Sequence, residues 1–425
     1  MSERTEIREL ESLGKLASGN TPSKSNPDYW NGTIPWITAK DLKSFELSTS
    51  LDKITPSAVS NGAKLAPPGS VLILVRGMGL FKGIPVGLAK TELAFNQDVK
   101  AFVPNKGVDG RFVGYALMAA EPILRSGVTA AGHGTGRLNI DQLQLFPIRI
   151  PPLTEQHRIV SILDEWVDAI KTAEKLLETK LRRKDAIRLA LFNGSLRRGN
   201  NTGEWSPMPL ANLLRIRDET SDGGETVCSV SVGRGLIDQI EHLGRSFAAA
   251  NTGNYNRVCY GDIVYTKSPT GRFPLGIVKQ SHIDEDVIVS PLYGVYVPIS
   301  VAHGRLIDLY FSSPSAAEKY LAPFVHRGAK NTMAITDEGF LAGEIPMPPT
   351  QEEADATGEM IEALDNEIDR LRDYCGHLRL QKRGLMQKLL SGDWPVPASI
   401  DRLLPGGQEV DEAVGAEVQR AEATG

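Results

Sequence analysis

One long segment occurs twice in this chain. The first copy runs from Pro151 to Gly194, and a more divergent second copy runs from Pro348 to Gly392. The opening Pro-Pro pairs stand 197 residues apart (348 − 151), and the closing glycines stand 198 apart (392 − 194). A repeat with a fixed long period indicates a duplicated module, so we expect two related halves.

Both copies have the pattern of long helices. Apolar residues recur at steps of three and four, as at the a and d positions of a coiled coil. A helix of about 40 residues is roughly 60 Å long. The two helices would most simply bury their apolar stripes against each other as an antiparallel pair; alternatively, each stripe packs onto its own neighbouring domain. The predicted interface residues are Leu163, Trp166, Ile170 and Leu177 in the first copy, and Leu364, Ile368, Leu371 and Leu378 in the second.

Capping residues mark the ends of both predicted helices. Thr154 and Thr350 follow the Pro-Pro pairs and are the predicted N-caps. Gly194 and Gly392 are predicted to end the helices in the left-handed conformation.

A segment of short β-forming runs and turns precedes each helical copy. In the first, the runs at 70–75 and 99–103 are predicted strands, and Gly110 to Arg125 is a predicted helix. Similar runs recur at 262–265 and 296–298. The predicted fold is α+β: two similar β-rich domains separated by two long antiparallel helices, with pseudo-two-fold symmetry. The predicted domains are 1–150, 151–198 (helical repeat), 204–347 and 348–393 (helical repeat), followed by a disordered acidic tail at 394–425.

Composition sets few limits on function. The chain has 425 residues, and its net charge of −5 lies largely in the tail, where residues 405–425 sum to −4. The folded part is therefore near neutral, which leaves room for local basic patches. The three cysteines have no C-x-x-C spacing, and no run is apolar and long enough to cross a membrane. We expect a soluble cytoplasmic protein.

The sequence lacks three common catalytic motifs. It has no nucleotide-binding G-x-x-x-x-G-K-[ST], no zinc-binding H-E-x-x-H and no Asn-Pro-Pro-aromatic motif of amino-methyltransferases. Pro27-Asp28 and Thr38-Ala39-Lys40 resemble a metal-dependent nuclease motif, but Thr38 stands where a carboxylate is needed. We therefore predict no catalytic residue and no metal site.

Basic residues gather at turns near the predicted strands and are candidates for contacts with DNA. Arg and Lys bind phosphates and, in suitable geometry, guanine edges. The glycine-rich segment from His133 to Arg137 is either a tight turn or a phosphate cradle. The residues predicted to bind DNA are Lys24, Lys40, Arg76, Lys82, Arg137, Lys267, Arg272, Arg327, Lys330 and Asn331.

The repeats and the first domain resemble a known family. The helical repeats, through Pro151-Pro152-Leu153-Thr154-Glu155-Gln156 and Gly384-Leu385-Met386-Gln387-Lys388-Leu389-Leu390-Ser391-Gly392, are similar to those of the specificity (S) subunits of type I restriction-modification systems. The first domain resembles a target-recognition domain of that family in Gly19-Asn20-Thr21-Pro22, Tyr29-Trp30, Ile34-Pro35-Trp36-Ile37 and Asn96-Gln97. The resemblance covers residues 7 to 396.

This resemblance implies a non-catalytic subunit. Each target-recognition domain would read one half of a bipartite, asymmetric site in double-stranded DNA, and the paired helices would set the spacing. Two modification (methyltransferase) subunits would dock on the chain, and restriction (motor-nuclease) subunits would join through them. The chain itself would bind no cofactor; S-adenosylmethionine, ATP and Mg²⁺ would belong to the partner subunits. Two alternatives remain, namely a stand-alone DNA-modifying enzyme fused to a coiled coil and a structural scaffold.

Overall fold

The chain folds into two compact units. The computed structural model describes residues 5–132, 134–197, 204–240, 252–267, 269–327 and 333–403. The first unit comprises residues 1–173 and 374–425, and the second comprises residues 174–373. Each unit therefore contains part of both long helices, α6 (Leu153–Phe192) and α11 (Gln351–Ser391). The predicted disordered tail at 394–425 is ordered at its start, because Ala398–Leu403 forms a 3₁₀ helix and Arg158 Nε lies 2.6 Å from Asp401 Oδ1. From residue 404 on, the tail lies outside the described residues.

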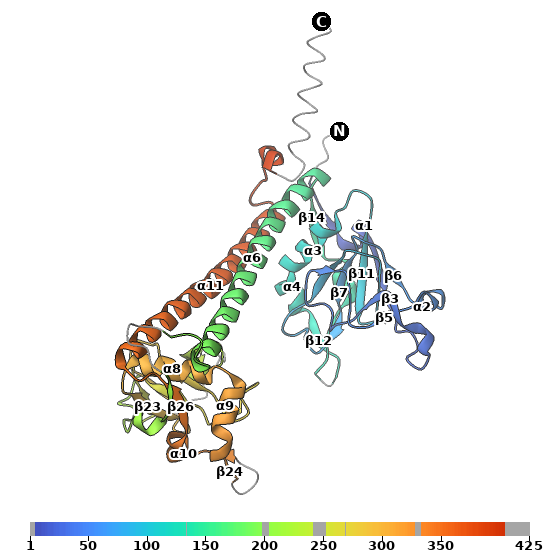
Figure 1. The fold of residues 1–425 in the computed structure, drawn as a ribbon. Coiled ribbons are helices and arrows are strands. Elements are labelled where there is room, and N and C mark those ends of the chain that lie inside the picture. The colour runs from blue at the N-terminus through green and yellow to red at the C-terminus, as the bar shows by residue number, and fades with distance from the viewer. Residues whose placement is uncertain are drawn as a thin grey trace. The chain divides into compact units, whose positions relative to one another are not determined.

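The first unit is built on β-sheets (Figure 1). Its largest sheet has the strand order β2-β11-β7-β9-β4, which are Gly14–Ser18, Val99–Pro104, Val71–Leu74, Val86–Ala89 and Glu46–Leu47. A second sheet has the order β5-β3-β10-β6, which are Lys53–Ile54, Trp30–Ile37, Leu93–Phe95 and Leu65–Ala66. A third contains β12 (Val128–Ala130), β13 (Gly136–Leu138) and β8 (Arg76–Gly77). β1 (Glu6–Glu9) pairs with β14 (Pro147–Ile150).

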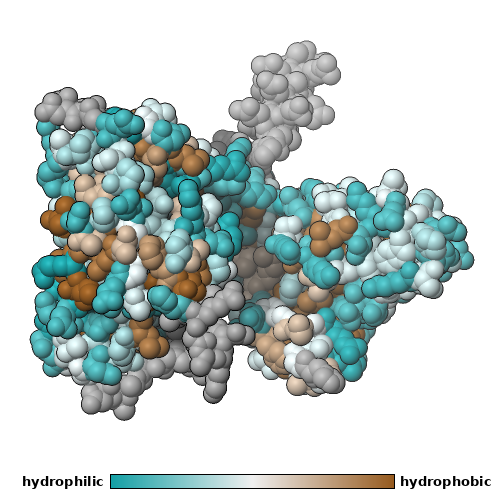
Figure 2. Space-filling view, turned by 60° about the horizontal axis from the view of Figure 1, so that its bottom comes forward, coloured by the Kyte–Doolittle hydropathy of each residue, from teal (hydrophilic) through white to brown (hydrophobic). Residues whose placement is uncertain are grey.

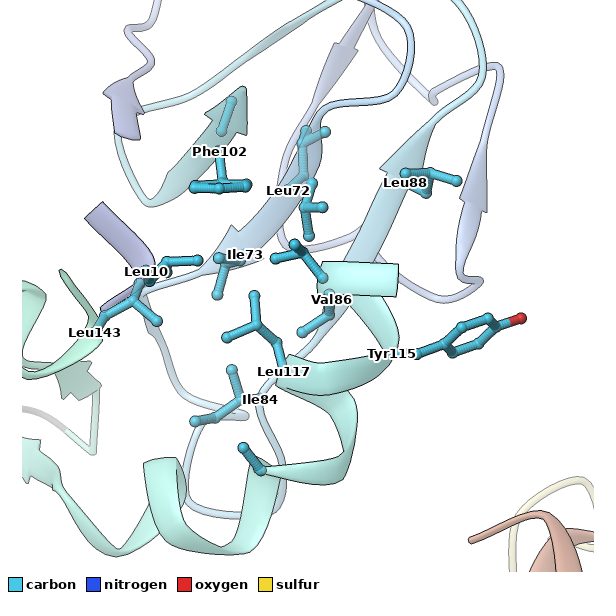
Figure 3. Packing of buried hydrophobic residues seen from close by; sticks show 14 of the residues in the cluster. Leu10, Leu72, Ile73, Ile84, Val86, Leu88, Phe102, Tyr115, Leu117 and Leu143 are labelled. Carbon is cyan, nitrogen blue, oxygen red and sulfur yellow. The ribbon is translucent and has the colours of Figure 1, made fainter. Parts of the chain in front are cut away.

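The core of the first unit lies on both faces of strand β7. All four residues of β7 are buried, so the strand is covered on both sides. Helix α3 (Gly110–Ala119) packs against β7 and β9. In Figure 3, Leu117 of α3 points toward Ile73, whereas Tyr115 points its hydroxyl away from the aliphatic cluster. The predicted strands at 70–75 and 99–103 are thus confirmed.

The predicted helix over Gly110–Arg125 proves to be two helices. α3 ends at Ala119, and α4 spans Glu121–Ser126 with Pro122 in its first turn. In one continuous helix Pro122 would have to donate an N–H to the Met118 carbonyl; proline has no N–H and its ring clashes with that carbonyl, which explains the break. The remaining helices of this unit are α1 (Leu10–Leu13), α2 (Pro56–Ser60) and α5 (Ile140–Gln144).

The second unit repeats the topology of the first. The order β16-β23-β20-β21, which are Leu214–Ile216, Gly294–Pro298, Ile263–Tyr265 and Val278–Gln280, corresponds to β2-β11-β7-β9. Helices α8 (Val301–Phe311), α9 (Pro314–Leu321) and α10 (Asp337–Ala342) correspond in chain order to α3, α4 and α5. The two-stranded pairs are β15 (Ser206–Pro209) with β26 (Glu344–Met347), β17 (Cys228–Ser231) with β18 (Gly235–Asp238), β19 (Asn256–Val258) with β22 (Val287–Val289), and β24 (His326–Arg327) with β25 (Met333–Ala334). The predicted α+β class is confirmed.

Helices α6 and α11 pack against each other within both units. In the first unit, Trp166, Ile170 and Ala173 of α6 pack with Cys375 and Leu378 of α11. In the second unit, Lys180 binds Glu367 at 2.5 Å and Lys184 binds Asp365. Rising numbers in α6 meet falling numbers in α11, so the pair is antiparallel.

The apolar stripes also pack onto the β-rich parts. Ile159, Leu163 and Leu389 belong to the hydrophobic core of the first unit, and Leu191 and Ile361 belong to that of the second. Both arrangements predicted from the sequence are therefore present. Leu364 and Ile368 are buried, whereas Leu177 and Leu371 are half-buried.

The helix ends follow the sequence signals at three of four places. Gly194 and Gly392 have φ of 87° and 85°, as predicted for left-handed stops. The Thr350 hydroxyl accepts a hydrogen bond from the Glu353 N–H at 3.2 Å, which confirms this N-cap. The prediction for Thr154 is wrong: α6 already begins at Leu153, because the Pro152 carbonyl accepts from the Gln156 N–H at 3.0 Å.

Gln156 and Glu353 occupy equivalent positions of the two repeats and fasten the helix starts differently. The buried Gln156 amide accepts from the Asp109 N–H at 2.8 Å and donates to the carbonyls of Gly107 and Pro151. The buried Glu353 carboxylate accepts from the Trp205 indole N–H at 2.8 Å. Both contacts tie a helix to the β-rich part of its own unit.

Candidate nucleic-acid interface

Two arginines predicted to bind DNA lie directly opposite each other in the first unit. Strands β13 and β8 are antiparallel, with Arg137 paired to Arg76 and Gly136 paired to Gly77. Directly opposed residues point to the same face of a sheet, and like charges there repel each other. Both side chains are exposed. Within the described part of the chain, neither guanidinium has a hydrogen-bond or ion-pair partner, so the pair presents uncompensated positive charge to solvent.

The local sequence explains why β13 holds this position. Leu138 is buried, and its N–H donates to the Val75 carbonyl at 2.9 Å. A Cβ at Gly136 would lie 2.9 Å from both Leu80 Cβ and Val128 Cγ1, so only glycine fits there without rearrangement. Gly136 and Leu138 are both buried, so the alternation of side chains along the strand turns Arg137, which lies between them, toward solvent.

The glycine-rich segment forms the turn between β12 and β13. Gly132 and Gly134 have φ of 85° and 73°, and the Thr135 N–H donates to the Gly132 carbonyl at 2.9 Å. The predicted tight turn is therefore present; His133 lies outside the described residues. Beside the hairpin, Thr129, Arg137 and Asn139 line a hollow of about 420 Å³.

The three lysines predicted in the first unit are exposed. Lys24 precedes a short 3₁₀ turn, Lys40 lies in the turn after β3, and Lys82 lies in the loop between β8 and β9. No side-chain partner is found for these ammonium groups among the described residues. Figure 2 shows a face on which hydrophilic residues predominate and hydrophobic residues form several small patches.

In the second unit, Arg272 is exposed and Lys267 is bound internally. Arg272 lies in the turn between Thr270 and Phe273, beside a hollow of about 350 Å³ that Arg234 and Lys279 also line. Lys267 has a left-handed φ of 55°, and its Nζ donates to Asp337 Oδ1 at 2.6 Å. A DNA contact by Lys267 would therefore have to replace or share this ion pair.

The hydrogen bonds to Asp337 keep its carboxylate ionised beside Lys267. Its carboxylate also accepts from the Tyr296 hydroxyl at 2.7 Å. Burial by itself would raise the pKa of Asp337, but the hydrogen bonds from Lys267 and Tyr296 outweigh burial and lower that pKa. Asp337 thus stays ionised and keeps the Lys267 side chain in place.

The remaining predicted residues of the second unit are not fully described. Arg327 lies on β24, paired with Met333 of β25. This hairpin occupies the same place in chain order as β12–β13. Lys330 and Asn331 belong to the segment between β24 and β25 and lie outside the described residues.

A hollow beside the β3–β5 pair was not predicted as a site. It has a volume of about 560 Å³, and its lining includes Lys24, Trp30, Asn31, Trp36, Asp52 and Lys53. Asn31-Gly32 is recognisable in the sequence as a turn. Lys53 follows this turn by more than twenty residues, and it lies beside the turn because it pairs with Pro35 of β3. The sequence does not reveal this pairing.

Two further properties of the described residues bear on function. No group of three or more His, Cys, Asp and Glu side chains is placed to hold a metal ion in the described ranges. Among the helices that the structure describes, none combines the length and the apolar character needed to span a membrane.

Comparison with known proteins points to one family. Residues 2–180 match the family model described as "Type I restriction modification DNA specificity domain". The specificity subunit of a type I restriction enzyme from Escherichia coli is 34% identical over 163 residues, which are 38% of this chain and 40% of that protein. A specificity subunit from Methanocaldococcus jannaschii is 22% identical over 404 residues, which are 89% of this chain and 90% of that protein.

Similarity of fold extends over nearly the whole chain. The solved S subunit of a type I restriction-modification system from M. genitalium aligns with a TM-score of 0.52 and 13% identity, covering 91% of this chain and 96% of that one. The chain therefore has the fold of a type I S subunit in both of its halves.

Proposed function

We propose that this chain is the DNA-sequence-specificity subunit of a type I restriction-modification complex. Residues 2–180 match the specificity domain of this family, and the second unit repeats the strand order of the first. Each β-rich part would read one half of a bipartite, asymmetric site. Since the two parts differ in sequence, the two half-sites would differ as well.

The directly opposed pair of Arg76 and Arg137 on neighbouring strands is the observation that carries this proposal. Two unpaired like charges directly opposite each other destabilise the fold, so their presence favours a role in binding. A phosphate between them would remove the repulsion, and each guanidinium can also bind a guanine edge in bidentate fashion. This site is expected to contact the DNA backbone or the major groove.

The long helices would set the gap between the half-sites and receive the partner subunits. α6 and α11 are continuous over 40 and 41 residues, and each contributes residues to both units. Two modification subunits would dock on the chain, and restriction subunits would join through them. The chain would be non-catalytic, with S-adenosylmethionine, ATP and Mg²⁺ bound by those partners.

Methyl transfer with and without partners tests this proposal. The chain is incubated with labelled S-adenosylmethionine and DNA, alone and together with its modification subunits. We expect label in the DNA only when the chain and the modification subunits are present together. The assembled complex should also bind DNA sequence-specifically, with an affinity that falls as the salt concentration rises. Turnover by the chain alone would instead support a DNA-modifying enzyme, and a complex without sequence preference would support a scaffold.

A further inference from the structure

The hollow beside β3 and β5 combines two indole rings with unpaired polar groups. The rings of Trp30 and Trp36 meet edge to face, with centroids 5.0 Å apart and planes at 86°. Each indole N–H donates to a backbone carbonyl: Trp30 to Ser23 at 3.0 Å and Trp36 to Asn20 at 3.2 Å. These hydrogen bonds fix the ring orientations. Trp36 is only 5% exposed and packs in the small core beside the hollow, so the half-buried ring of Trp30 is the one that offers a ligand an apolar surface.

The backbone beside the rings is distorted. Trp30 and Ile34 of β3 both register with Ile54 of β5, so residues 31–33 form a bulge. Asn31 has a left-handed φ of 60°, and a Cβ at Gly32 would lie 2.2 Å from the Ile54 carbonyl oxygen. Bulges and left-handed residues other than glycine concentrate near binding sites. Glycine would adopt the conformation of Asn31 at lower cost, so the backbone does not require the Asn31 amide.

Four polar side chains of the hollow have no partner. No hydrogen bond or ion pair within the described ranges engages the side chain of Lys24, Asn31, Asp52 or Lys53. All four residues are exposed or nearly so. A hollow of about 560 Å³ lies within the usual range for small-molecule sites, roughly 300–1,000 Å³. Together, the site offers aromatic surface, one amide, one carboxylate and two ammonium groups.

We propose that this hollow binds one unstacked purine nucleotide of the bound DNA. An aromatic ring stacks on a base face, and a paired base inside a duplex shows only its edges to a protein. Asn31 would pair with a purine edge, as Asn does with adenine N6 and N7. Lys24 and Lys53 would bind the flanking phosphates. This inference rests on the proposed function and adds a base-reading site to the first unit.

Free purine nucleotides share this chemistry, so the experiment must separate the two sources. In one arm, the full chain assembled with its modification subunits binds duplexes that carry the recognised sequence with a single mismatch or abasic partner at each position in turn. A base that is already unpaired costs less to extrude, so one purine position should bind about tenfold tighter when its partner is missing. In the other arm, the same complex is titrated with adenosine monophosphate in the absence of DNA.

Asn31→Gly and Trp30→Leu are the informative variants. Asn31→Gly removes the amide but suits the left-handed backbone, so thermal stability should be unchanged or raised while the gain at the unpaired position is lost. Trp30→Leu should lose the same gain. Lys90→Ala, an exposed position outside the hollow whose side chain contacts Glu46 at 3.5 Å, should keep it.

The outcomes distinguish this inference from the proposed function. If the complex binds the intact duplex specifically but no mismatch or abasic partner raises the affinity, the nucleotide site is overturned and the proposed function stands. The nucleotide site is also overturned if the Asn31→Gly variant keeps the increase in affinity at the unpaired position. Saturable binding of adenosine monophosphate without the unpaired-base gain would assign the hollow to a free nucleotide instead. Absence of any sequence-specific binding would refute the proposed function itself.

Discussion

Arg111 of α3 and Asp164 of α6 form an ion pair in the first unit, with Arg111 Nε 2.8 Å from Asp164 Oδ1. The same carboxylate oxygen accepts from the Tyr115 hydroxyl at 2.5 Å, and Arg111 Nη1 lies 2.7 Å from Glu46 Oε1. The hydrogen bond from Arg111 holds the pKa of Glu46 below its usual value despite partial burial. One half-buried cation thus joins the β-rich part to the long helix.

Asp164→Ala should destabilise the first unit by about 2–3 kcal/mol, because it leaves the Arg111 guanidinium half-buried with one acidic partner fewer. Urea unfolding followed by circular dichroism measures the change. Asp168→Ala on the same helix is the matched control: its carboxylate is 73% exposed, and its contact with Lys171 is worth about 0–1 kcal/mol. Equal effects of the two substitutions would show that the Arg111–Asp164 pair does not fasten the helix.

Leu378→Asp should disrupt the packing of α6 on α11. Leu378 is 6% exposed and belongs to a cluster with Cys375 and Ala173. Burying a carboxylate there costs about 4 kcal/mol or more, at the severe end of single substitutions. Leu380→Asp, two residues along the same helix at a position 66% exposed, should cost less than about 0.5 kcal/mol. Thermal unfolding compares the two, and a stable Leu378→Asp chain would contradict the paired-helix arrangement.

Arg137→Ala and Arg76→Ala should each weaken DNA binding. Loss of a guanidinium–phosphate contact lowers affinity for all sequences and reduces the salt slope by about 1, whereas loss of a guanine contact relaxes specificity at one position. Because each change relieves repulsion between like charges, folding stability should be unchanged or slightly raised. The exposed Arg183→Ala on α6 is the control. Fluorescence anisotropy at several salt concentrations measures both effects; undiminished affinity would remove this pair from the interface.

His303 should make the stability of the second unit depend on pH. The side chain is 5% exposed, and its Nδ1 lies 2.9 Å from the Ser300 hydroxyl oxygen. Burial lowers the pKa of His303 below 6.5, with Asp355 opposing the shift. The unfolded chain therefore binds more protons below about pH 6.5, and stability falls as the pH drops from there toward the folded-state pKa.

The slope between these two pKa values approaches about 1.4 kcal/mol per pH unit. Chemical denaturation at half-unit steps from pH 7.5 to 5 measures it. His303→Gln should flatten the profile, whereas His377→Gln at an exposed position of α11 should leave it unchanged. The same slope in wild type and His303→Gln would mean that other groups titrate.

The sequence predicts the helices better than the surfaces between strands. The bounds of both repeats place α6 and α11 to within three residues, because a long amphipathic helix is a local property. Thr154 and Thr350 both come soon after a Pro-Pro pair, but only Thr350 is an N-cap. The Gln156 N–H donates to the Pro152 carbonyl, so α6 has already begun before Thr154. The pairing of Arg76 with Arg137 joins strands sixty residues apart, and the bond from Lys267 to Asp337 spans seventy. Nothing local in the chain encodes such contacts.

Methylation mapping with lengthened helices tests the account most directly. A heptad is inserted after Ala173 in α6 and another after Asp373 in α11, where the two units meet in the chain. Seven helical residues add about 10 Å, or about three base pairs of duplex. DNA modified by the assembled complex should show a two-part asymmetric sequence with both half-sites unchanged and the gap longer by about three base pairs. Altered half-sites, an unchanged gap or one continuous recognition sequence would contradict it.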